Sequence, residues 1–268
     1  MSKSYVHGYE QRESVRLQDQ ANTLVELLHG DTKYPENAMV LEAGCGVGAQ
    51  TITLAKNSPK AKITSIDISE ASVEQARKTI ESAGYSNVSF QQGDIFNLDF
   101  APQSFDHLFI CFVLEHLARP NEALKSLKRL LKPGGTTTVI EGDHGSAYFY
   151  PYSTFAQNAI QCQIDLQSKA GGNALIGRQL FPLLEKVGFK DVLVSPRMVY
   201  VDSNRPELVD GFTKNTFIAM VEGIRKEAIE EQLISEHDFD KGIVDLYRSA
   251  EIDGVFCYTF FKAVGKNG

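Results

Sequence analysis

Cysteine is scarce in this sequence and shows no pairing pattern. The 268 residues include four cysteines, at positions 45, 111, 162 and 257. They form no C-x-x-C pair, and their spacing matches no zinc-binding pattern. Cys111 and Cys257 lie in apolar runs, where a buried free thiol is expected. The sequence therefore predicts no metal site, reduced thiols and a cytoplasmic location.

Long apolar segments and an excess of positive charge are also missing. No apolar stretch is long enough to cross a bilayer, and the polar start of the chain lacks the apolar region of a signal peptide. The formal net charge is −7, whereas nucleic acid or an anionic membrane usually requires a basic stripe. The densest basic cluster, residues 125–132, is typical of a solvated helix face. We therefore expect neither nucleic acid nor a membrane as the partner.

What the chain does contain is a regular alternation of strand and helix patterns. Hydrophobic residues make up 43% of the sequence, enough for a sizeable core. Strands are expected at residues 38–42, 62–67, 88–91, 105–114 and 136–141. Helices are expected between them, at residues 49–56, 70–83 and 121–131, and a turn at residues 133–135. This order predicts a parallel sheet with right-handed crossovers.

The alternation loosens after residue 141. Helices are expected at residues 153–168 and 175–187, and strands at residues 191–201 and 255–264. Residues 206–249 are helical in pattern and too long for a loop, so they predict a helical cap inserted between the last two strands.

A glycine-rich loop follows the first strand, with the sequence V-L-E-A-G-C-G-V-G at residues 40–48. Glycines permit a tight turn and a close approach of a ligand to the backbone. The next helix offers its free N–H groups to an anion, either a pyrophosphate or a carboxylate. Gly44, Gly46 and Ala49 also fit the dinucleotide fingerprint G-x-G-x-x-G/A, so this motif leaves both cofactors open.

Two acidic positions follow later strands. Asp67 ends the second strand, where its carboxylate can accept both hydroxyls of a ribose. It can also be a helix N-cap, for which Ser69 is an equally good candidate. Asp94, in the G-D-I run at residues 93–95, can accept a hydrogen bond from an adenine amino group while Ile95 packs on the ring. A dinucleotide-binding fold does not require an acidic residue after the third strand.

Taken together, these motifs resemble those of the class I S-adenosylmethionine-dependent methyltransferases. The closest similarity is to the type 11 group, which includes the ubiquinone and menaquinone biosynthesis methyltransferases. The matching motifs lie within residues 38–141: E-x-G-x-G-x-G at 42–48, Asp67, G-D-I at 93–95, S-F-D at 104–106, L-E-H-L at 114–117 and L-K-P-G-G at 131–135. The resemblance implies a Rossmann-like α/β fold with a mostly parallel seven-stranded sheet, helices on both faces and an antiparallel final strand.

The resemblance also implies S-adenosylmethionine as the cofactor and a role for each matching residue. Glu42 would order the glycine loop, and Gly44, Cys45 and Gly46 would approach the methionine part through their backbone. Asp67 would bind the ribose. The other implied contacts are Ile68, Asp94 and Ile95 around the adenine, and Phe112 and Val113 beside the sulfonium. Tyr9 and Arg16 could close on the methionine carboxylate, although a solvated leader is an equal alternative.

Methyl transfer would require orientation more than chemistry from the protein, because the cofactor carries the reactivity. His116 and His144 follow the fourth and fifth strands, and either could take a proton from a hydroxyl acceptor. We favour His144 over His116, and a reaction without a protein base stays open. Aromatic side chains of the second half could line the site of a small apolar or aromatic acceptor, although many of them are expected to be core residues instead. They are Tyr148, Phe149, Tyr150, Tyr152, Phe155, Phe181, Phe212 and Phe217.

The expected organisation is a single domain with four parts. These are an N-terminal helical segment at residues 1–37, a cofactor-binding core at 38–142, the rest of the sheet and the substrate side at 143–205 and 255–268, and the inserted cap at 206–254. Two other functions remain open, a non-catalytic S-adenosylmethionine-binding module and an NAD(P)-dependent oxidoreductase. The sequence leaves the acceptor, the methylated atom and a homodimer undecided.

Overall fold

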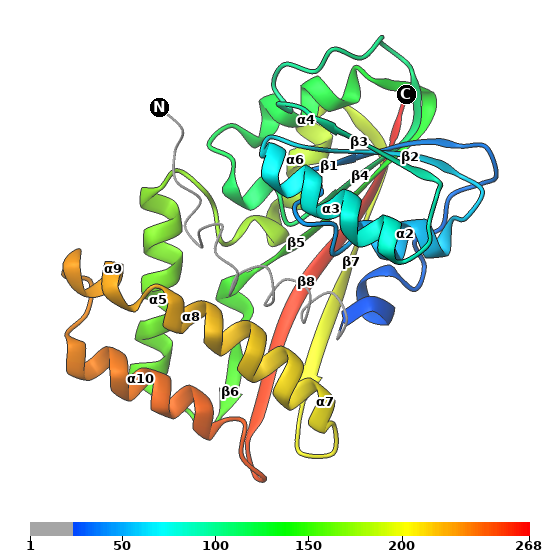
Figure 1. The fold of residues 1–268 in the computed structure, drawn as a ribbon. Coiled ribbons are helices and arrows are strands. Elements are labelled where there is room, and N and C mark those ends of the chain that lie inside the picture. Colours follow the sequence, from blue (N-terminus) through cyan, green and yellow to red (C-terminus); the bar gives the residue numbers. More distant parts are fainter. Residues whose placement is uncertain (1–23) are drawn as a thin grey trace. The chain divides into compact units, whose positions relative to one another are not determined.

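The computed structural model describes residues 24–268 (Figure 1). Residues 24–29 are helical, and Gly30 follows in a turn. Tyr9 and Arg16, the two predicted contacts of the methionine carboxylate, lie outside the described residues.

Strands and helices alternate along the first half of the described chain, which confirms the predicted pattern. The elements are β1 (Met39–Ala43), α2 (Thr51–Asn57), β2 (Lys62–Asp67), α3 (Glu70–Ser82), β3 (Val88–Gln92), β4 (Phe105–Cys111), η1 (Leu114–His116), α4 (Pro120–Lys128) and β5 (Leu131–Gly142). Strand β4 ends three residues before the predicted position, because Phe112 has a φ of 57° and breaks the extended chain. The predicted turn at residues 133–135 lies inside β5, where the register against β4 shifts from Phe105–Leu131 to His107–Thr136.

The second half contains more helix than strand. Its elements are η2 (His144–Ser146), β6 (Tyr148–Tyr150), α5 (Thr154–Lys169), η3 (Ile176–Gln179), α6 (Leu180–Val187), β7 (Phe189–Val201), α7 (Pro206–Leu208), the π-helix η4 (Val209–Ile218), α8 (Ala219–Gly223), α9 (Arg225–Glu230), α10 (Glu236–Arg248) and β8 (Val255–Asn267). Residues 206–248 are therefore largely helical, as the sequence predicts. Within residues 24–268 no helix has the length and apolar composition needed to cross a membrane.

The sheet has the order β3-β2-β1-β4-β5-β8-β6, with β7 paired to β8. The pairs formed among β1, β2, β3, β4 and β5 are parallel, and β8 is antiparallel to β6. The fold class is confirmed as a mostly parallel α/β sheet with an antiparallel final strand. The described residues form eight strands instead of seven, and the strand that the sequence did not predict is the three-residue β6.

The described chain divides into two compact units. The core unit contains Leu28–Glu141, Ile176–Pro196 and Phe261–Gly268. The helical unit contains Gly142–Leu175 and Arg197–Phe260, together with residues 24–27 of the described chain. The predicted organisation as a single domain with an inserted cap stays a prediction.

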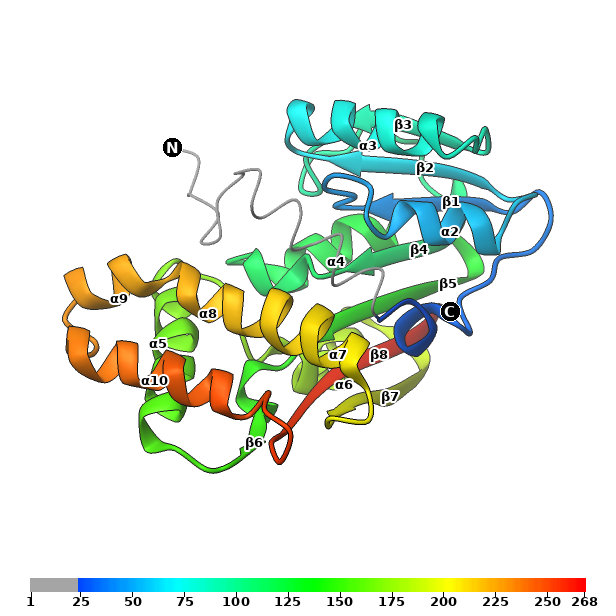
Figure 2. The same cartoon turned by 60° about the horizontal axis from the view of Figure 1, so that its bottom comes forward.

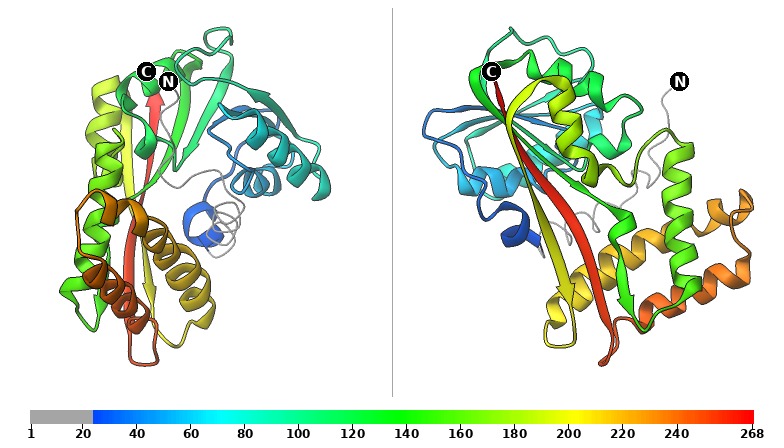
Figure 3. Two further views of the ribbon diagram at one scale, coloured as in Figure 1. Left: turned by 60° about the vertical axis from the view of Figure 1, so that its left-hand side comes forward. Right: turned by 180° about the vertical axis from the view of Figure 1, so that it is seen from behind.

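In the core unit, helices cover both faces of the sheet. Helices α2 and α3 lie on one face, and α4 and α6 lie on the other (Figure 3). Strand β4 is apolar on both faces because both are covered, and Leu108, Phe109 and Ile110 are at most 1% exposed. One face packs Leu41, Leu108 and Val139 against apolar side chains of α4 and α6. This packing fixes the carboxyl ends of β1, β4 and β5 relative to one another.

In the helical unit, α10 packs along α5, and α8 and α9 also contact α5 (Figure 2). Gly242 of α10 permits the close approach, because a Cβ atom there would lie 2.6 Å from the backbone oxygen of Phe155. A second cluster is aromatic and is formed by Phe212 and Phe217 of η4 with Phe256, Tyr258 and Phe260 of β8. These five side chains are at most 3% exposed, so they form the core of this unit.

Candidate functional site

The glycine loop leaves β1 at the carboxyl edge of the sheet in the core unit. The N–H groups of Gly44 and Cys45 both donate to the backbone oxygen of Ile66, at 2.8 and 2.9 Å. A Cβ atom on Gly44 would lie 2.4 Å from Cγ2 of Val113, so a larger residue does not fit there. Among the described residues, a Cβ on Gly46 would meet no atom within 4 Å. The loop is therefore packed at Gly44 and open at Gly46.

Glu42 is a buried carboxyl that joins three elements around this loop. Its Oε2 accepts hydrogen bonds from Thr51 Oγ1 on α2, at 2.7 Å, and from Ser65 Oγ on β2, at 2.6 Å. Burial raises the pKa of Glu42 to about 7, and the Asp67 carboxylate adds to the increase while the two hydroxyls oppose it. Glu42 thus ties β1 to α2 and β2 through two partners that no sequence signal identified, and its role in ordering the loop stays a prediction.

Asp67, at the end of β2, holds two backbone groups with its two carboxylate oxygens. Oδ2 accepts from the N–H of Gly46 and Oδ1 from the N–H of Ser69, both at 2.9 Å. Ser69 is the N-cap of α3, since its hydroxyl accepts from the N–H of Ser72. Of the two alternatives for the helix cap, the structure thus assigns Ser69. Asp67 is left beside the open side of the loop at Gly46.

The residues predicted to contact adenine lie at the ends of β2 and β3. The N–H of Gly93 donates to the backbone oxygen of Asp67 at 2.9 Å, which brings the G-D-I run next to Asp67. Ile68 is 62% exposed, Asp94 is exposed and Ile95 is half-buried. The Oδ1 atom of Asp94 accepts from the N–H of Phe96 at 2.9 Å. An exposed apolar side chain and an exposed carboxylate at one edge suit the flat face and the polar rim of an adenine.

Phe112 and Val113 form the turn that follows β4. The N–H of Phe112 donates to the backbone oxygen of Ile140 on β5 at 2.9 Å. The side chain of Val113 lies against Gly44, where it fills the space that a Cβ atom on that glycine would need. The core unit therefore brings together the predicted cofactor residues of β1, β2, β3 and β4 at one edge of the sheet.

The two histidines lie in different units. His116, in the core unit, has a side chain that is 20% exposed, and its Nε2 lies 3.6 Å from Oε1 of Glu115. His144, in the helical unit, is buried, and its Nδ1 lies 2.9 Å from the hydroxyl of Tyr258. Asp143, the residue before His144, accepts from the N–H of Gly145 at 3.1 Å. Sequence reasoning missed Tyr258, because 114 residues separate it from His144.

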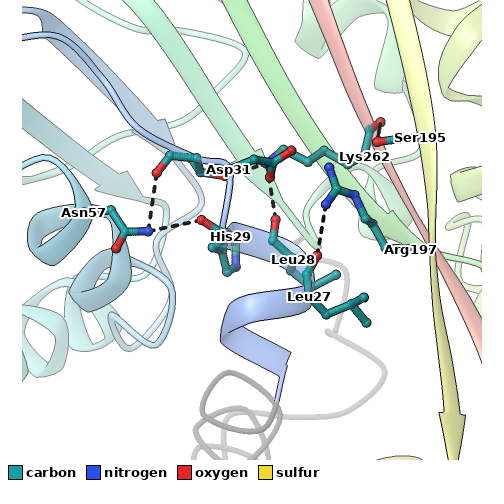
Figure 4. Close-up of polar contacts among 9 residues, drawn as sticks. Leu27, Leu28, His29, Asp31, Asn57, Ser195, Arg197 and Lys262 are labelled. Atoms are coloured by element: carbon teal, nitrogen blue, oxygen red, sulfur yellow. Dashed lines mark hydrogen bonds and ion pairs between the residues drawn. The ribbon is translucent and has the colours of Figure 1, made fainter.

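A buried lysine supports the chain next to the glycine loop. Nζ of Lys262 lies 2.6 Å from Oδ1 of Asp31 and donates to Thr32 Oγ1 at 2.6 Å, and Figure 4 shows the lysine reaching toward Asp31. Nε2 of His29 lies 2.7 Å from Oε1 of Gln50, the residue before α2. Residues 29–32 are thereby attached both to β8 and to the end of the loop. Within residues 24–268, no three or more His, Cys, Asp or Glu side chains are grouped in a way that could hold a metal ion.

Comparison with known proteins identifies the family. A family model described as a methyltransferase domain matches residues 35–174. The chain belongs to the class I S-adenosylmethionine-dependent methyltransferases. The match includes the whole predicted motif region, from the glycine loop to the L-K-P-G-G turn. Membership favours S-adenosylmethionine over the nicotinamide cofactor that the glycine loop alone left open.

Individual relatives are similar over part of their length. A 37.1 kDa uncharacterized protein of a Streptomyces fradiae transposon is 35% identical over 196 residues, which are 72% of this chain and 55% of that protein. A demethylmenaquinone methyltransferase of Staphylococcus aureus is 37% identical over 112 residues, 41% of this chain and 46% of the relative. The chain thus spans about half the length of these curated relatives.

A solved structure shares the fold over nearly the full chain. It is a SAM-dependent methyltransferase from Thermotoga maritima with a TM-score of 0.55 and 20% sequence identity. The similarity covers 96% of this chain and 94% of that chain. The residues of the glycine loop fit the family's cofactor, because Gly46 is open to a ligand and the Asp67 carboxylate lies beside it.

Proposed function

We propose that this protein transfers the methyl group of S-adenosylmethionine to a small apolar or aromatic acceptor. The observation that carries the proposal is the geometry of the glycine loop at Gly46. A Cβ atom there would meet no described atom within 4 Å, and the N–H of Gly46 donates to the Asp67 carboxylate. A carboxylate oxygen has two lone pairs, so each oxygen of Asp67 can accept a ribose hydroxyl in addition to its backbone N–H. Family membership supports the same cofactor.

The residues of the core unit have separate tasks in this reaction. When bound, S-adenosylmethionine would supply the methyl group on its positively charged sulfur for in-line transfer to the acceptor, with S-adenosylhomocysteine as the leaving group. The backbone at Gly44 and Gly46 receives the methionine part, and Asp67 holds the ribose. Ile68, Asp94 and Ile95 surround the adenine. Val113 closes the loop at Gly44 and orients the reacting end, so that the protein contributes alignment and exclusion of water.

The class of acceptor is inferred from a relative and from composition. The Staphylococcus aureus relative is named a demethylmenaquinone methyltransferase, which supports a small-molecule acceptor. Of the aromatic side chains expected to line the acceptor site, Phe212 and Phe217 belong to the core of the helical unit. Tyr148, Tyr150 and Tyr152 are more than 60% exposed. These three tyrosines are therefore the better candidates for contact with an apolar molecule.

The partners follow from the same proposal. A small molecule is proposed as the only partner besides the cofactor, without nucleic acid and without a membrane, in a cytoplasmic protein. The support is the net charge of −7 and the scattered basic residues. A homodimer is tested by sedimentation of the purified protein.

Thermal unfolding tests the cofactor. A ligand that binds only the folded protein raises the melting temperature. S-adenosylhomocysteine is expected to raise it, and NAD and NADP are expected to leave it unchanged. A rise with NAD or NADP alone would overturn the proposal. Transfer of a labelled methyl group to candidate aromatic acceptors then separates an enzyme from a binding module, which would bind the cofactor and show no turnover with any of them.

A further inference from the structure

The carboxyl of Glu141, near the end of β5, holds the turn that follows β4. Its Oε1 accepts hydrogen bonds from the N–H groups of Val113, at 3.0 Å, and Leu114, at 2.7 Å. Val113 and Leu114 begin the short helix η1, whose first N–H groups have no partner within the helix. Glu141 supplies that partner from another strand. Its side chain is completely buried, so water cannot take over the task.

The turn held by Glu141 contains an unfavourable backbone conformation. Phe112 has a φ of 57°, in the left-handed region that bulky L-residues rarely adopt. Two neighbouring residues of β5 secure it, since Ile140 accepts from the N–H of Phe112 and Glu141 accepts from the next two. The shape of the turn sets the position of Val113, whose side chain packs on Gly44 of the cofactor loop.

From these contacts we infer that Glu141 is a positioning residue for the cofactor: its carboxyl holds the turn at Phe112–Leu114, and the turn holds Val113 against Gly44. The inference rests on the proposed binding of S-adenosylmethionine at the glycine loop. In this inference Glu141 has no contact with the cofactor. It acts through Val113, and its effect is on how well the loop is ordered before the cofactor binds.

The surroundings of Glu141 favour the uncharged form. Its Oε2 is buried and has no hydrogen-bond partner among the described residues, and a carboxylate would leave that oxygen charged without compensation. Burial raises the pKa of Glu141 well above its usual range, and the nearby Glu115 carboxyl raises it further, while the backbone N–H groups oppose both. The Cys111 thiol, also close, stays uncharged because burial raises its pKa. Nε2 of His116 lies 3.6 Å from Oε1 of Glu115, and the positive charge of Lys262 lowers the pKa of Cys111 against the effect of burial.

Three variants of the full chain test the inference by calorimetric titration with S-adenosylhomocysteine. In Glu141→Gln, the amide oxygen accepts the same two N–H groups, so the affinity is expected to stay within about threefold of the wild type. In Glu141→Ala, both N–H groups lose their partner, and the affinity is expected to fall about tenfold or more. Thr137→Val is the matched control, since Thr137 is buried on the same strand and its hydroxyl has no partner among the described residues. Its affinity is expected to remain that of the wild type.

A pH series without ligand tests the uncharged form. A carboxyl whose pKa is raised in the folded protein loses its stabilising effect as the pH rises above the unfolded-state pKa. The melting temperature of Glu141→Gln minus that of the wild type is therefore expected to increase between about pH 5 and about pH 8. Near-UV circular dichroism confirms that each variant is folded.

The outcomes separate this inference from the proposed function. A wild type that does not bind S-adenosylhomocysteine overturns the proposed function. Wild-type affinity in folded Glu141→Ala, or an equal loss of affinity in Thr137→Val, overturns the positioning role. If the melting temperatures of Glu141→Gln and the wild type differ by the same amount at every pH, Glu141 is not uncharged in the folded protein. A Glu141→Gln variant that binds as weakly as Glu141→Ala leads to the same conclusion.

Discussion

The hydroxyl of Tyr258 and Nδ1 of His144 lie 2.9 Å apart in the interior of the helical unit. The contact requires a glycine at position 142, because a Cβ atom there would lie 2.4 Å from the Tyr258 hydroxyl. If Nδ1 of His144 carries no hydrogen, the Tyr258 hydroxyl donates to it; if Nδ1 carries the hydrogen, the hydroxyl accepts from it. In a neutral ring, only the second arrangement leaves Nε2 of His144 with a lone pair that can take a proton. Tyr258 therefore influences whether His144 can act as a base.

Replacement of His144 tests its role in proton transfer. If His144 takes a proton from a hydroxyl acceptor, His144→Ala is expected to lower the turnover rate by about 10² to 10⁴ and to leave the affinity for S-adenosylhomocysteine unchanged. Tyr258→Phe is expected to give a smaller loss and a shifted pH profile of turnover. His237→Ala, which changes an exposed histidine, is the control. A loss below about fivefold in His144→Ala would assign the rate to proximity and orientation alone.

Asp67 should be essential for cofactor affinity and Ser69 should not. Asp67→Ala would remove the two proposed hydrogen bonds of a charged group to the ribose, worth about 1.5–3 kcal/mol each, so the affinity is expected to fall by about a hundredfold or more. Ser69→Ala removes the cap of α3 and is expected to cost about 1 kcal/mol of stability without changing the affinity. Titration calorimetry and thermal unfolding measure the two effects. Equal affinity in Asp67→Ala and the wild type would leave Asp67 with a structural role only.

The two glycines of the loop should respond differently to alanine. In Gly44→Ala, the new methyl group would overlap Val113, so a loss of stability of about 1–3 kcal/mol is expected. In Gly46→Ala, the methyl group meets no neighbour, and the main cost is the left-handed backbone, about 1 kcal/mol. Because the cofactor is proposed to approach Gly46, this variant is expected to lose affinity out of proportion to its stability. A Gly46→Ala variant with normal affinity would place the cofactor elsewhere.

Glu42 should make the stability of the protein depend on pH near neutrality. Its pKa is about 7 in the folded protein, above its ordinary value of 4.5. Because the pKa is raised in the folded state, the contribution of Glu42 to the free energy of unfolding is fully present below about pH 4.5. It declines by about 3 kcal/mol as the pH rises to about 7. Glu42→Gln is expected to gain stability relative to the wild type across this range in chemical denaturation. Glu36→Gln, at an exposed carboxyl, serves as the control, and an unchanged difference between pH 5 and pH 7 would contradict the prediction.

The helical segment at residues 206–249 is predicted to cover the acceptor during the reaction. It contains the π-helix η4, a rare conformation that occurs frequently at functional sites. Limited proteolysis within this segment is expected to slow when S-adenosylhomocysteine and an acceptor are both present. Cleavage at the same rate with and without the two ligands would rule out a lid.

The sequence alone determined the order of strands and helices in the core unit and the positions that should contact a cofactor. It could do so because these signals are local. A strand that runs into glycines, an acidic residue at a strand end and an apolar strand all depend on neighbours within a few residues. The same reasoning fails for β6, whose three residues are too short to show a period and form a strand only by pairing with Val255–Cys257.

Only the tertiary structure decided which side chains support the predicted residues. Thr51 and Ser65 hold Glu42, Tyr258 meets His144, and Glu141 holds the turn at Val113, over separations of 9 to 114 residues. These partners carry no signal in the chain, because a buried hydroxyl or carboxyl finds its partner through the pairing of strands and the packing of helices. The backbone at Phe112 is the clearest case. Its apolar surroundings predict a continuing strand, and the hydrogen bonds that β5 supplies to the turn bend the chain into the left-handed conformation instead.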